Sequence, residues 1–232
     1  MAWPLRPTLT ACVVVYSLAS AGGVSAGCSS SPGPGTDWSG CRKMSKVLQD
    51  YDLNGAKFVR ADLSRSNFKA AKLVGADFTK ANLSYTILRR ANLSKAKLTG
   101  AFGTRTYMKE AIMKGVDLSK AEFFRAQMTA VDLSSANLNG SQLSRADLTA
   151  ANLDAADARN ANLSRAKLGL ASFNQTNMEN AYLYRTDLRG VDLSNAIGLT
   201  QTQLRGSCGD SDTRLPSGLQ APGEWPCALE KE

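Results

Sequence analysis

The sequence predicts a solenoid, a fold in which short turns of chain stack along one axis, and two observations predict it. An apolar residue returns every fifth position from residue 53 to residue 198, as eighteen Leu, five Phe and four Met in thirty places. The position two residues earlier, from 51 to 196, is Ala in twenty of thirty places. None of these sixty positions is charged, although 21% of the chain is. Both columns therefore face inward over the whole segment, as expected for a repeat protein that buries one continuous core.

A five-residue period excludes the ordinary templates. A coiled coil places apolar residues three and four apart, and a half-buried strand alternates strictly. A long helix is also disfavoured, because Gly, Asn, Asp, Ser and Thr crowd residues 51–198. A solenoid of stacked turns is the template that remains compatible with this period.

Units such as ANLSK, ADLTA and VDLSS resemble the pentapeptide-repeat family, whose pattern is Ala, Asp or Asn, Leu, Ser or Thr, then any residue. The resemblance covers residues 51–198 and implies an all-β fold, a right-handed quadrilateral parallel β-helix. One pentapeptide forms each side, so thirty units imply about 7.5 coils. Residues 27–50 are expected to be a Ser/Pro/Gly tether and N-terminal cap, and residues 199–232 a C-terminal cap. We expect Leu215, Leu219 and Trp225 to lie over the last coil.

Residues 1–26 have the layout of a secretory signal peptide. Arg6 precedes an apolar run over residues 9–18, which is too short to span a membrane, and Val24-Ser25-Ala26 fits a cleavage site. We therefore expect a secreted or periplasmic protein with no transmembrane span in the mature chain. Two alternatives remain open: a lipid anchor on Cys28 that attaches the protein to the cell envelope, and an uncleaved N-terminal anchor.

Four cysteines remain after removal of the signal peptide, in a compartment that permits disulfides: Cys28, Cys41, Cys208 and Cys227. In the implied rod, Cys41 and Cys208 lie at opposite ends, whereas a disulfide requires Cα atoms within about 7 Å. We therefore expect Cys208 to pair with Cys227 and Cys28 with Cys41. The second pair is incompatible with a lipid on Cys28. Free thiols buried as small apolar residues are the alternative.

The outward columns carry the function, and one of them is rich in arginine. With twenty residues per coil, one fifth-position column on one side collects Arg65, Tyr85, Arg105, Arg125, Arg145, Arg165 and Arg185. At the usual inter-strand spacing this Arg row is roughly 29 Å long. Guanidinium groups suit phosphate, sulfate or carboxylate, so the expected partner is an anionic macromolecule or an acidic protein surface. The alternative is a merely solvated face, partly neutralised by the flanking residues Asp62, Glu122, Asp147 and Asp187.

Several function classes are disfavoured. The chain has no histidine, the commonest general base and metal ligand, and no phosphate-binding glycine loop, so we expect no catalytic, cofactor or metal site. Gyrase-directed members of the family imitate DNA with an acidic rod, but this rod has 21 basic and 13 acidic residues. An exported protein is also poorly matched to nucleic acid. The polar C-terminal segment favours a monomer.

Overall fold

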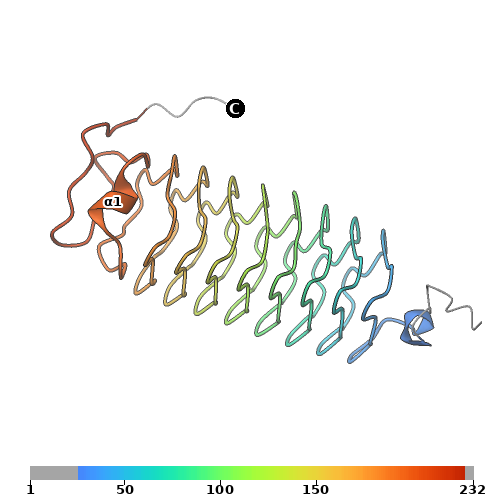
Figure 1. The fold of residues 1–232 in the computed structure, drawn as a ribbon. Helices are drawn as coiled ribbons and strands as arrows, with labels where there is room; N and C mark the ends of the chain where they lie inside the picture. Colours follow the sequence, from blue (N-terminus) through green and yellow to red (C-terminus); the bar gives the residue numbers. More distant parts are fainter. Residues whose placement is uncertain (1–25, 228–232) are drawn as a thin grey trace, which may run out of the picture.

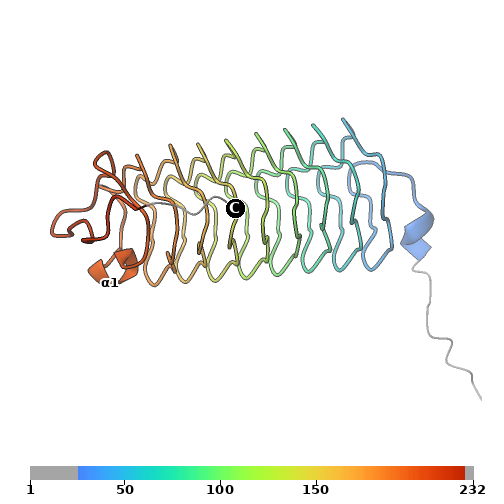
Figure 2. The same cartoon turned by 90° about the horizontal axis from the view of Figure 1, so that it is seen from above.

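The computed structural model describes residues 26–227, and these form a right-handed quadrilateral parallel β-helix. The chain winds as a rod of stacked coils, with the N-terminal segment at one end and the C-terminal segment at the other (Figures 1 and 2). Among the described residues, a 3-10 helix, η1 (Ala26–Ser29), lies at the first end and a helical turn, α1 (Gln201–Leu204), at the second. The expected signal peptide lies outside the described residues, apart from Ala26.

The coils are joined by single parallel bridges, each between a residue and the one twenty positions later. Eight of these bridges connect Asp37 to Ile197 without interruption, by way of Lys57, Asp77, Lys97, Asp117, Asn137, Asp157 and Asn177. The twenty-residue coil implied by the resemblance is therefore the repeat of the structure. After residue 197 the register loosens, because Asp187 pairs with Cys208 and Asp192 with Arg214.

The ladder begins at Asp37, so the expected boundary at residue 51 is wrong. Trp38 and Leu48 already occupy core positions and are 2% exposed. This coil was not predicted because Lys43 and Lys46 occupy positions of the two inward columns, which were expected to carry no charge. They are tolerated because no coil lies beyond them: at this open end Lys43 Nζ lies 4.3 Å from the centre of the Trp38 ring.

Each side of a coil ends in a turn that explains the repeat pattern. The amide of Ala56 donates to the carbonyl of Leu53 across such a turn, at 3.1 Å. The fifth residue has positive φ, as the type II turn requires, for example 61° at Arg65 and 65° at Gly55. An Asp or Asn at the second position accepts the amide two residues on, as Asp62 does from Ser64 at 3.1 Å. The acidic residues of the repeat thus have a local structural role.

The two inward columns form one continuous core. Nearly all of their apolar side chains are completely buried, and a buried Leu or Phe contributes about 1.5–3 kcal/mol. Near the N-terminal end, Phe58 packs against Trp38 and Phe78, with ring centres 5.9 and 4.8 Å apart. Gly103 interrupts the Leu column because Phe123 of the next coil fills its place: a Cβ on Gly103 would lie 2.8 Å from that ring.

Residues of the C-terminal segment pack against the last coil. Leu204 of α1 is completely buried, and the Gln203 side-chain amide donates to the carbonyls of Met178 and Ala181 at 2.7 and 3.0 Å. Leu215, Leu219 and Trp225 pack against the end of the core. The Trp225 indole lies where a side chain on Gly209 would stand, which explains the glycine.

Each end of the rod contains a pair of cysteines. The structure joins Cys28 to Cys41, with Cα atoms 5.6 Å apart, and Cys208 to Cys227, with Cα atoms 5.5 Å apart. Both separations suit a disulfide. The formation of both bonds in the protein stays a prediction.

Candidate functional site

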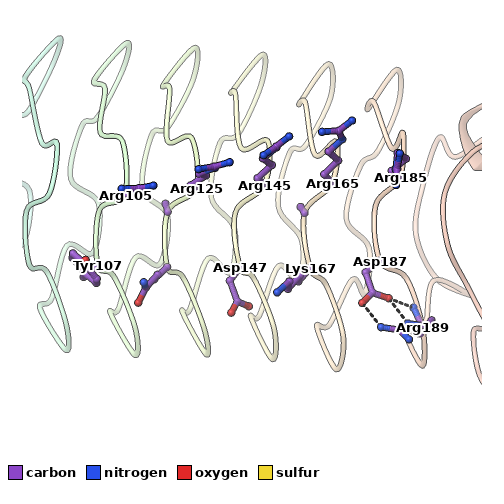
Figure 3. Close-up of a pocket in the computed structure, with 13 residues that line it drawn as sticks. Arg105, Tyr107, Arg125, Arg145, Asp147, Arg165, Lys167, Arg185, Asp187 and Arg189 are labelled. Carbon is purple, nitrogen blue, oxygen red and sulfur yellow. Dashed lines mark hydrogen bonds and ion pairs between the residues drawn. The ribbon is translucent and has the colours of Figure 1, made fainter. Parts of the chain in front are cut away.

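Five residues of the Arg row lie side by side on successive coils (Figure 3): Arg105, Arg125, Arg145, Arg165 and Arg185. The backbone explains the alignment, because the amide of each row residue donates to a carbonyl of the next coil. The amides of Arg105, Arg125 and Arg165 donate to Phe124, Ser144 and Tyr184, at 3.0, 3.1 and 2.9 Å. Arg65, Tyr85, Arg105, Arg125 and Arg165 are exposed, whereas Arg145 and Arg185 are half-buried.

The row forms one edge of a side of the rod that we call the basic face. It consists of residues 65–70, 85–90, 105–110, 125–130, 145–150, 165–170 and 185–190. An open groove of about 1090 Å³ runs along it from Arg105 to Arg189. Tyr107, Asp147, Lys167 and Asp187 form a second row across the groove from the arginines (Figure 3).

Charge is strongly concentrated on this face. It holds twelve of the 21 basic residues of segment 51–198 and three of its 13 acidic residues, a net charge of +9. The rest of that segment has nine basic and ten acidic residues, a net charge of −1. A surface with so much unbalanced positive charge attracts anions over its whole length.

Asp147 and Asp187, which lie beside the Arg row, are engaged by groups outside that row. Within residues 26–227 the guanidinium groups of Arg65, Arg105, Arg125, Arg145 and Arg165 form no ion pair. Asp147 instead accepts the amide of Thr149 at 3.0 Å. Asp187 pairs with Arg189 at 2.9 Å, and these hydrogen bonds raise the pKa of Arg189.

Glu110, at the far edge of the face, also pairs away from the row. It accepts from Arg90 Nε at 2.6 Å, and this bond holds the pKa of Glu110 below its ordinary value. The proposed neutralisation by neighbouring carboxylates therefore has no contact to support it at these five arginines.

An aromatic side chain orients two of the arginines. The guanidinium carbon of Arg125 lies 5.3 Å from the centre of the Phe124 ring, and that of Arg145 lies 6.0 Å from it. Phe124 is 40% exposed and does not belong to the buried core. A cation over an aromatic face is attracted by the ring quadrupole. Phe124 thus restricts both guanidinium groups to the row.

Buried hydroxyl groups fix the turns that carry the row. Thr186 Oγ1 donates to the carbonyl of Leu163 at 2.8 Å, and this carbonyl belongs to the turn that contains Arg165. Thr86 makes the equivalent bond to Leu63, at 3.2 Å, in the turn of Arg65. Both threonines are completely buried. These bonds between coils hold the guanidinium groups on a rigid frame.

The sequence-based interpretation found one edge of the face and missed the rest. It applied the twenty-residue phase only to the fifth position of each unit. The same phase applied to the fourth position collects a second basic edge: Lys69, Arg89, Lys109 and Arg189. The same phase applied to the second position collects the second row that lines the groove, which includes Tyr107 and Lys167. The signal was therefore present in the sequence.

The described part of the chain shows neither a metal-binding cluster nor a membrane-spanning helix. Residues 26–227 contain no group of three or more His, Cys, Asp or Glu placed to hold a metal ion. No helix in that range has the length and apolar character needed to cross a membrane. The arrangement offers spaced guanidinium and ammonium groups on a rigid surface, which suits electrostatic recognition.

These features define a β-helical repeat protein with one basic side. The family description "Pentapeptide repeats" matches the chain in eight copies, over residues 48–84, 86–123, 126–165 and 161–197. The protein belongs to the pentapeptide-repeat family. No curated protein matches it.

The chain is similar to several solved structures, among them the following three. A trypsin-treated variant of QnrB1, a plasmid-mediated fluoroquinolone resistance protein, is 19% identical with a TM-score of 0.59, and the match covers 75% of this chain and 89% of QnrB1. HetL from Nostoc sp. strain PCC 7120 is 29% identical, over 77% of this chain and 82% of its own, with a TM-score of 0.34. Rfr23 from Cyanothece 51142 is 16% identical, over 78% and 90%, with a TM-score of 0.21. The likeness to QnrB1 supports the fold alone.

Proposed function

We propose that this pentapeptide-repeat protein is a secreted or periplasmic, non-enzymatic rod whose basic face binds an anionic partner. The observation that supports this most directly is the net charge of +9 on one side, against −1 for the rest of segment 51–198. The fold does not require this asymmetry, because all four sides use the same turn and the same core columns. Rigid alignment of the Arg row lowers the entropy that would otherwise be lost on binding.

The test compares two triple variants. The first carries Arg125→Gln, Arg145→Gln and Arg165→Gln. The control removes the same charge from the same turn position elsewhere, with Arg60→Gln, Lys80→Gln and Lys120→Gln. All six residues have positive φ, and Gln175 occupies this position natively with φ of 56°, so both variants should fold.

Binding of both proteins to heparin, polyphosphate and polyglutamate is measured by calorimetry at low and high salt. We expect the first variant to bind about tenfold more weakly than the control, because three contacts at the protein surface are each worth up to about 1 kcal/mol. The difference should shrink at high salt. Equal loss in both variants would contradict a role for the basic face.

The alternative is an envelope-anchored scaffold with a lipid on Cys28. The pairing of Cys28 with Cys41 supports the unmodified form, because a disulfide-bonded sulfur carries no lipid. Mass spectrometry of the mature N-terminus separates the two: a free Gly27 supports secretion, and a diacylglyceryl Cys28 supports the anchor.

A topoisomerase-binding DNA mimic is the least favoured function. The fold is similar to that of a fluoroquinolone resistance protein, but imitation of DNA requires an acidic surface and this rod is basic. We also propose that the protein acts as a monomer, since α1 and the segment around Trp225 cover the C-terminal end of the core.

A further inference from the structure

We propose that the ligand of the basic face is an acidic polysaccharide, a chain of hydroxylated sugar rings that carries carboxylate or sulfate groups at intervals and lies lengthwise along the rod. This inference rests on the proposed function and specifies its ligand. It follows from three features of the face: a cation on every coil, hydrogen-bonding groups between the cations, and few aromatic rings that are free to stack.

Positive charge continues along the face without a gap. Each of its seven segments, from 65–70 to 185–190, contains at least one Arg or Lys. Where Tyr85 interrupts the Arg row, Arg89 supplies the charge from the opposite edge. A compact ligand would need only a local cluster. A cation on every coil over roughly 29 Å fits an extended ligand with repeating acidic groups.

The groove between the edges suits hydroxyl groups better than densely packed phosphates. Two carboxylates line the groove among the cations: Asp187, which Arg189 already holds, and Asp147, which forms no ion pair within residues 26–227. A carboxylate accepts hydrogen bonds from sugar hydroxyls, but it repels a phosphate placed against it. The side chains of Gln127 and Thr129 make no hydrogen bond within residues 26–227 and are available to a neutral polar ligand. The face therefore fits an anion whose charges are separated by hydroxylated rings.

Phe124, Tyr182 and Tyr184 do not offer the free stacking surfaces on which single-stranded nucleic acids depend. Tyr85 and Tyr107 have no ring or cation contact within residues 26–227, but two rings along seven coils do not form a series of stacking platforms. Phe124 is engaged by the guanidinium groups of Arg125 and Arg145. Tyr182 and Tyr184 stack on each other, with centres 6.3 Å apart. Recognition by spaced guanidinium groups is favoured over recognition by base stacking.

The experiment measures binding of the purified protein to three sets of anionic chains of graded length: oligogalacturonates with heparin fragments, polyphosphates, and single-stranded DNA. Neutral dextran serves as the blank. We expect the sugar chains to bind most tightly at equal charge, with an affinity that rises with length and levels off once the chain spans the face.

Asp147→Asn is the discriminating variant. Asn67 accepts the amide of Lys69 in the same way that Asp147 accepts that of Thr149, so this change should keep the turn. Loss of the negative charge should strengthen polyphosphate and DNA binding by about threefold, while sugar binding changes by less than about twofold.

The outcomes separate this inference from the proposed function. Tighter binding of polyphosphate or DNA than of the sugar chains would overturn the polysaccharide inference and leave an anion-binding rod. Affinity that is independent of chain length would also overturn it, since a lengthwise ligand gains contacts coil by coil. If no chain distinguishes the native protein from the Arg125, Arg145 and Arg165 triple variant, both proposals fail.

Discussion

The basic face and the face opposite it share one backbone but differ in charge. The opposite face, residues 55–60, 75–80, 95–100, 115–120, 135–140, 155–160 and 175–180, carries seven basic and four acidic residues, a net charge of +3 against +9. One of its columns alternates in sign, from Lys57 through Asp77 and Lys97 to Asp117. The fold thus accepts balanced charge as readily as unbalanced charge. The excess on the basic face therefore calls for a functional explanation.

Charge reversal should break this comparison most strongly. In the Arg125→Glu, Arg145→Glu and Arg165→Glu variant, repulsion replaces attraction at three adjacent coils, and polyanion binding should weaken by about a hundredfold. The matched variant with Arg60→Glu, Lys80→Glu and Lys120→Glu should lose less than about threefold. Calorimetric titration checks both. A comparable loss in the two variants would mean that overall charge, rather than the basic face, determines binding.

The next largest effect should come from the buried hydroxyl bonds. Thr186→Val removes the bond to the turn that carries Arg165, and Thr176→Val removes the equivalent bond to Leu153 on the opposite face. Each change should lower the free energy of unfolding by about 1 kcal/mol. Only Thr186→Val should also weaken anion binding, by about threefold, because it loosens the Arg row. Denaturant unfolding and titration of the same samples measure the two effects, and equal effects on binding would argue against a preorganised row.

A smaller effect is expected from Phe124→Leu. The substitution removes the ring that lies against Arg125 and Arg145 but keeps an apolar side chain at an exposed position. Binding should weaken by about twofold with little change in melting temperature, because cation–π contacts at exposed sites are worth about 0.5–1 kcal/mol. Phe124→Trp, which offers a better ring, should restore binding. Failure of this rescue would leave Phe124 without a positioning role.

The smallest effect should be a pH dependence of stability on the opposite face. The hydrogen bond from Arg159 holds the pKa of Asp157 below its ordinary value. A group whose pKa is lower in the folded state stabilises the protein above its unfolded pKa, and this contribution is lost as the pH falls through the folded pKa. Asp157→Asn keeps the turn and removes the titration. The melting temperatures of the two proteins should therefore converge as the pH is lowered from 7 to 3. A difference that widens at low pH would contradict a lowered pKa of Asp157 in the folded state.

Much of the fold and part of the site were accessible from the sequence, and the residues show why. The Leu and Ala columns predicted a stacked core because burial excludes charge from each inward position. The Arg row followed once twenty residues were taken as one coil. The first coil was missed because Lys43 and Lys46 interrupt the columns at an end where solvent is still accessible. The twenty-residue coil places Phe123 next to Gly103, but the rotamer by which its ring fills the space at Gly103 depends on tertiary packing.

The sequence by itself determined the period, the inward columns and the side on which arginines gather, because each follows from the spacing of residues along the chain. Only the tertiary structure decided which side chains form ion pairs, hydrogen bonds or ring contacts with one another. Asp187 pairs with Arg189, Phe124 lies close to two guanidinium groups, and Asp147 accepts a turn amide. These contacts depend on side-chain rotamers and on neighbours one coil away. A five-residue pattern specifies where a residue lies on the rod, but several partners stand within reach of each side chain, and packing selects among them.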